Sequence, residues 1–134
     1  MFVHKLTPDE RRAFFGLAKH MIAADGRIAE AELVALRQIE VEAGFSSDEI
    51  APTDPSDTRT LDILKGHRAR AATLLELLGL AYSDHEYHPA ESAMIKSVAA
   101  GLGVTETVLL QMENWVLRQM ALAAEADRFF EEDS

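Results

Sequence analysis

Carboxylate side chains recur at two turns of the sequence, each set between runs of apolar residues. The first turn has Asp25 followed by Glu32, and the second has Asp84 followed by Glu91 at the same separation. An aspartate that ends one helix and a glutamate that begins the next can face each other across the bend. Hard divalent cations take carboxylate oxygens as ligands. These four residues are therefore candidate metal ligands, and a pseudo-two-fold axis could bring the two turns together.

The first turn resembles only half of a known calcium-binding loop. Residues 25–32 match the second half of an EF-hand loop, with a glycine at the sharp turn and a glutamate at the last position. The first two ligand positions would fall on Met21 and Ala23, whose side chains cannot bind a cation. A conventional EF-hand is therefore excluded, and a cation here needs further ligands from elsewhere in the chain.

The second turn adds imidazole groups to its carboxylates, through His85, Glu86 and His88. Imidazole combined with carboxylate suits zinc or another transition metal. A structural interpretation stays open for both turns. The helix macrodipole alone favours a glutamate at a helix start, and Asp-Gly is a common turn dipeptide.

The sequence lacks the residues that several classes of function require. The chain has no cysteine, and it contains no phosphate-binding loop, dinucleotide fingerprint, nucleophile elbow or H-E-x-x-H motif. We therefore expect no enzyme activity, with catalysis by paired carboxylates or a histidine-bound metal as the remaining alternative. The net charge of −10 argues against nucleic-acid binding and is compatible with a cation or a basic partner. No apolar run is long enough for membrane insertion and no signal peptide is evident, so we expect a cytoplasmic protein.

The turns sit in a pattern of amphipathic helices. Thr7, Pro8 and Glu10 form a capping box that opens the first helix. The second helix is expected to bury one stripe and to end at Gly44. A second capping box at residues 46–49 predicts a short helix, and residues 51–60 form the one clear loop. The buried stripe of the second helix consists of Leu33, Leu36, Ile39 and Ala43.

The second half of the chain follows a similar order. Helical periodicity resumes near Leu61, with Gly66 as a kink or a break. Residues 74–81 are apolar nearly all round, which predicts a central buried helix. Pro89 starts the next helix, and a last helix covers about residues 106–130. Its expected inner face comprises Val108, Met112, Trp115, Val116, Gln119 and Leu122.

A shift of the sequence by 59 residues aligns the two halves. Asp25 then falls on Asp84, Glu32 on Glu91, and Gly44 on Gly103, none of which an apolar core requires. The sequence therefore predicts an all-α, single-domain helical bundle over residues 1–134. It contains an internal two-fold pseudo-repeat of helix–acidic turn–helix units, with halves at about 7–50 and 67–110.

Two segments carry a resemblance to a known family. Residues 17–32 (LAKHMIAADGRIAEAE) resemble the first signature of TerB-like, tellurite-resistance domains. Residues 77–91 (LLGLAYSDHEYHPAE) resemble the second, which is followed by LGVT at 102–105. The resemblance covers roughly residues 6–110. One departure is His85, which stands where the family usually has glycine.

The resemblance implies an all-α fold with a pseudo-repeat and a non-enzymatic role in bacterial tellurite-resistance and stress systems. It also implies a link to metal binding and to membrane-associated protein partners, with the family's acidic positions at Asp25, Glu32, Asp84 and Glu91. We therefore expect an interaction or scaffold protein with an acidic, divalent-cation-binding surface. A plain helical adaptor without a metal is the alternative, and exposed leucine-rich helix faces could support a homodimer.

Overall fold

The computed structural model describes residues 1–24, 30–83 and 87–131. This part of the chain is helical and contains no strand, which confirms the predicted all-α class. The elements are a short 3-10 helix, η1 (Val3–Lys5), and the α-helices α1 (Pro8–Ala23), α2 (Glu30–Ala43), α3 (Thr58–Ile63), α4 (His67–Ala81), α5 (Pro89–Gly101) and α6 (Glu106–Arg128).

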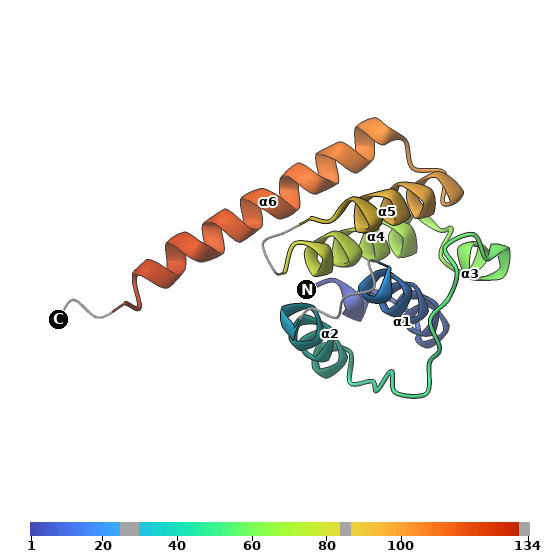
Figure 1. Cartoon of the computed structure of the whole chain (residues 1–134), viewed down its shortest axis with the longest axis horizontal. Coiled ribbons are helices and arrows are strands. Elements are labelled where there is room, and N and C mark those ends of the chain that lie inside the picture. Colours follow the sequence, from blue (N-terminus) through green and yellow to red (C-terminus); the bar gives the residue numbers. More distant parts are fainter. Residues whose placement is uncertain (25–29, 84–86, 132–134) are drawn as a thin grey trace.

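Helix α4 is the centre of the bundle. It contacts η1, α1, α2, α5 and α6, and Figure 1 shows it between α1 on one side and α5 and α6 on the other. Leu74, Leu77, Leu78 and Leu80 are all buried because neighbours cover every side of the helix. The predicted central buried helix is therefore confirmed, and it begins directly after Gly66, which separates α3 from α4.

The start of α1 follows the predicted capping box. The Thr7 hydroxyl accepts a hydrogen bond from the Glu10 backbone nitrogen at 3.3 Å, and the Thr7 nitrogen donates to Glu10 Oε1 at 2.8 Å. Pro8 occupies the first helical position, where the missing N–H costs nothing. Arg68 of α4 also binds Glu10, with Nη1 to Oε1 at 2.8 Å, which joins the two helix starts.

The prediction of a short helix that starts at residues 46–49 is wrong. Inside the predicted capping box, the nitrogen and hydroxyl of Ser47 both donate to Glu40 Oε2, at 2.7 and 2.9 Å. Lys19 binds the carbonyl oxygens of Ser47 and Ile50, so these carbonyls are held by a lysine rather than by a growing helix. The loop therefore covers residues 44–57, and the predicted end of the loop at 60 already belongs to α3.

Some of the predicted inner faces are also wrong. Leu33 of α2 is exposed, as are Val108 and Leu122 of α6. In α6 the buried residues are Leu109 and Val116, because the helix packs on α4 and α5 only along its first part. Residues 121–131 are all exposed, and Figure 1 shows the C-terminal half of α6 extending beyond the bundle.

Helices α1 and α2 match α4 and α5 when the chain is shifted by the predicted 59 residues. Arg11 Nη1 donates to the Ala43 carbonyl at 3.3 Å, and Arg70 Nη1 donates to the Leu102 carbonyl at 3.4 Å, at equivalent positions. Each arginine thus caps the end of the second helix of its pair. The matched caps support the duplication, which stays an inference.

The ends of α2 and α5 also match. Gly44 and Gly103 have positive φ angles of 63° and 77°. The next residue then donates back into each helix, from Phe45 to the Glu40 carbonyl at 3.0 Å and from Val104 to the Ala99 carbonyl at 2.8 Å. Both helices therefore end in the same hydrogen-bonded turn, which favours glycine at its left-handed position.

Replacing Gly44 by alanine should lower the free energy of unfolding by about 1 kcal/mol, because the left-handed conformation strains a Cβ atom. Urea unfolding followed by circular dichroism measures the change. Gly79→Ala is the matched control, since this glycine lies inside α4 with no atom close to the added Cβ. That variant should gain about 0.5–1 kcal/mol. Equal effects of the two substitutions would contradict the account of the turn.

Candidate functional site

The structure buries the glutamate of each acidic turn. Glu32 and Glu91 are each only 1% exposed. Each is the third residue of its helix, since α2 begins at Glu30 and α5 at Pro89. Both carboxylates therefore enter the interior at the start of a helix, whereas the sequence had suggested an acidic surface.

The start of α5 shows how such a carboxylate is held. Pro89 occupies the first helical position, and Glu91 Oε1 accepts a hydrogen bond from the His88 backbone nitrogen at 3.4 Å. The positive end of the helix dipole also favours a negative charge in this first turn. The side chain of His88 is partly exposed, so it lies at the surface above a buried carboxylate.

The other predicted ligands, Asp25, Asp84, His85 and Glu86, lie outside the described residues. Within the described part of the chain, no group of three or more histidine, aspartate or glutamate side chains is placed to hold a metal ion. The structure therefore fixes one carboxylate on the helix side of each turn, and the metal site stays a prediction.

Two tyrosines border the second turn, a feature that the sequence analysis missed. The Tyr82 hydroxyl donates to Glu113 Oε1 at 2.6 Å, and the rings of Tyr82 and Tyr87 pack edge to face with centroids 4.6 Å apart. Burial raises the pKa of both hydroxyls, and the negative charge of Glu113 raises both pKa values further. A hydrogen bond from Ser92 lowers the pKa of Tyr87 but does not cancel the rise. Both tyrosines are therefore neutral near pH 7, and the Tyr82 hydroxyl ties the start of the second turn to α6 through Glu113.

A second candidate site is a groove of about 340 Å³ that α2, α4 and α6 form together with Met1 and Phe2 at the N-terminus. Apolar side chains make up most of its lining. The residues that line it are Met1, Phe2, Ala35, Gln38, Ile39, Glu42, Leu75, Glu76, Gly79, Leu80, Trp115, Val116, Gln119, Met120 and Ala123. No local sequence signal could have revealed it, because its walls come from segments far apart in the chain.

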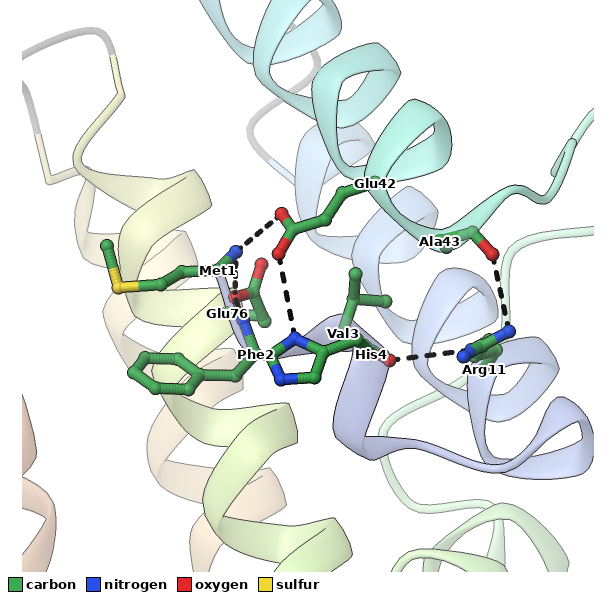
Figure 2. Close-up of polar contacts among 8 residues, drawn as sticks. All are labelled: Met1, Phe2, Val3, His4, Arg11, Glu42, Ala43 and Glu76. Carbon is green, nitrogen blue, oxygen red and sulfur yellow. Dashed lines mark hydrogen bonds and ion pairs between the residues drawn. The ribbon is translucent and has the colours of Figure 1, made fainter.

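One side of the groove is fixed by the N-terminal segment (Figure 2). The buried Glu76 carboxylate accepts from the Met1 ammonium at 2.9 Å and from the Phe2 nitrogen at 2.6 Å. Glu42 binds the same ammonium at 2.7 Å. The Phe2 ring packs on Trp115 of α6, with centroids 5.5 Å apart. The charged groups of this wall are thus engaged in structure, which leaves an apolar surface between α2 and α6.

The ammonium of Met1 makes stability depend on pH. Burial lowers its pKa, but the hydrogen bonds to Glu42 and Glu76 outweigh this and raise the pKa above 8.0. Because the pKa of this ammonium is higher in the folded chain, its full stabilising effect is present when the pH lies below its pKa in the unfolded chain. The effect is lost as the pH rises through its pKa in the folded chain.

The free energy of unfolding should therefore fall as the pH rises above about 8, and Glu76→Gln should flatten this fall. At pH 7 the variant should lose about 1–2 kcal/mol, because a neutral amide replaces the buried carboxylate that accepts from both the Met1 ammonium and the Phe2 nitrogen. Urea unfolding across the pH range measures both effects. Glu49→Gln, at an exposed loop position, is the control and should follow the wild type. Equal slopes for the wild type and Glu76→Gln would contradict the role of this carboxylate.

Comparison with known families gives one match. The family model described as tellurite resistance protein TerB matches residues 52–114, a range that includes the second turn and Glu91. The first signature, at residues 17–32, lies outside the matched range. Searches of curated proteins and of solved structures found no match. None of the described helices has the length and apolar character needed to cross a membrane.

Proposed function

Because the chain belongs to the TerB-like tellurite-resistance family, we propose that it is a non-enzymatic interaction module that binds a divalent cation at its acidic turns. The observation that carries this proposal is the equivalent burial of Glu32 and Glu91. Each lies at the third position of its helix and is 1% exposed. An ionised carboxylate is expensive to bury, so its retention at two matched positions indicates a role beyond helix capping.

The residues fit a hard cation. Asp25 and Glu32 would supply carboxylate oxygens at the first turn, and Asp84 and Glu91 at the second. A bound cation would neutralise these charges and connect the end of one helix with the start of the next, which stabilises the bend. The helix position of each glutamate fixes one ligand in advance, which lowers the entropy cost of binding.

The two turns differ in the metals that they favour. The first has oxygen ligands only and suits Ca²⁺ or Mg²⁺. The second adds His85, Glu86 and His88, and imidazole nitrogen combined with carboxylate favours Zn²⁺ or another transition metal. The departure from the family's glycine at His85 therefore supports a changed metal preference at the second turn.

A role in interaction agrees with the charge and with the surface. The net charge of −10 favours basic surfaces on protein partners, including those held at a membrane. The charged side chains that line the groove, Glu42 and Glu76, bind the N-terminus. This engagement supports a binding surface more than a catalytic one.

Calorimetric titration with Ca²⁺, Mg²⁺, Mn²⁺ and Zn²⁺ tests the proposal. The wild type should bind at least one of these ions, and Asp25→Asn and Asp84→Asn should each weaken binding at the affected turn by about tenfold or more, because a charged ligand is lost. Asp62→Asn is the matched control, since Asp62 is an exposed aspartate in α3. Heats equal to those of buffer dilution for every ion would refute the cation site.

Unfolding with and without the cation separates the proposal from a plain helical adaptor. A cation at one hundred times its Kd should add about 2.7 kcal/mol to the stability of the wild type. Glu32→Gln should lose most of this cation-dependent part, whereas Glu30→Gln, at the exposed first position of the same helix, should keep it. If the cation stabilises both variants equally, Glu32 has only a structural role, and the plain helical adaptor is then the better account.

A further inference from the structure

The apolar side chains at the C-terminal end of α6 have no partner among the described residues. Residues 121–131 are all exposed. Phe129 and Phe130, directly after the helix, are 87% and 84% exposed, and Leu122 is also exposed. Figure 1 shows this half of α6 leading away from every other helix. Two adjacent exposed phenylalanines in a chain of this charge are unusual enough to indicate a binding role.

The same chain carries a groove that matches this element. Gln119, Met120 and Ala123 of α6 form one wall of the apolar groove. Seven residues, or two helical turns, further along α6, the same face reaches Ala126, and Phe130 follows two residues after the helix ends at Arg128. The exposed apolar end is thus a continuation of the wall of the groove, and small alanines on that face allow another helix to approach closely.

We propose that this face of α6 binds a second copy of the chain. The two α6 helices pack antiparallel, and the Phe129–Phe130 end of each copy enters the groove of the other. A two-fold axis near the middle of the exposed half satisfies both contacts at once, because an isologous interface uses the same surface on both subunits. The inference does not depend on a bound cation.

The available area is close to what a stable dimer needs. Aromatic side chains bury roughly 150–250 Å² each, so two phenylalanines that are 87% and 84% exposed offer about 300 Å². Two such ends contribute about 600 Å², and the two grooves that they cover, the two Leu122 side chains and the alanine faces add to it. The total approaches the lower end of the range of about 1,200–2,000 Å² for specific interfaces.

Charge gives the dimer a distinctive response to salt. Two copies with a net charge of −10 each repel one another at long range, while the proposed contact itself is apolar. Added salt screens this repulsion and leaves the apolar contact intact. Dimerisation should therefore strengthen as the salt concentration rises, whereas binding of a basic partner to an acidic surface would weaken.

Sedimentation velocity over about 5–500 µM protein, in about 50 and 500 mM NaCl, tests the proposal. The mass should rise from 14.8 kDa towards twice that value with concentration, and more readily at high salt. The double variant Phe129→Ser, Phe130→Ser should weaken the dimer by about 30-fold or more, as for the loss of aromatic hot spots. Leu110→Ser removes an exposed apolar side chain that borders α5 and not the groove, and it should leave the dimer unchanged.

A mixing experiment tests the reciprocal geometry. Met120→Glu should block the groove and prevent dimerisation, as the double phenylalanine variant does by removing the inserted end. Mixed together, the two variants keep one intact contact, between the groove of the double phenylalanine variant and the phenylalanines of Met120→Glu, so a heterodimer should form. Unchanged thermal unfolding of each variant verifies that it is folded.

A wild type that stays at 14.8 kDa at every concentration and salt overturns the proposal. In that case, binding to uncharged phosphatidylcholine vesicles that disappears in the double phenylalanine variant would assign this end of α6 to a lipid surface. A dimer that the double variant and Met120→Glu both leave intact would also overturn it, because the interface would then lie elsewhere.

Discussion

The burial of a carboxylate at the start of α2 and again at the start of α5 is the constraint on which the rest of the fold depends. Glu32 and Glu91 can occupy the interior only if their helices begin at the right residue and point in the right direction. The far ends of the same helices are fixed by Arg11 and Arg70, which bind the last carbonyls. Both helices are thus held at both ends, and both contact the apolar helix α4.

The sequence predicts those features that depend on local chemistry. The capping box at Thr7, the glycine at Gly44 and the apolar character of α4 each result from side chains close in the chain, and all three are confirmed. The predicted helix at residues 46–49 failed because Glu40, seven residues before Ser47, takes the hydrogen bonds of that serine. Likewise, the periodicity of α6 continues past the end of the bundle, and so it cannot show where packing stops.

For the candidate sites, the sequence identified residues but not their surroundings. The acidic pattern selected Glu32 and Glu91, yet nothing local distinguishes an exposed glutamate at a helix start from a buried one. The groove needed the fold, because the N-terminus, α2, α4 and α6 meet there only after folding. Helix α2 belongs to both sites, since it begins after the first acidic turn and its side chains Gln38 and Glu42 line the groove.

A crystal structure grown with Mn²⁺, with data collected to detect anomalous scattering, tests the central claim most directly. The account predicts an anomalous peak bound by Glu32 together with Asp25, by Glu91 together with Asp84, or by both pairs, since each buried glutamate has an aspartate in the preceding turn. A structure in which both turns are ordered and no peak lies at either pair would contradict it. The two glutamates would then be structural elements of the helix starts.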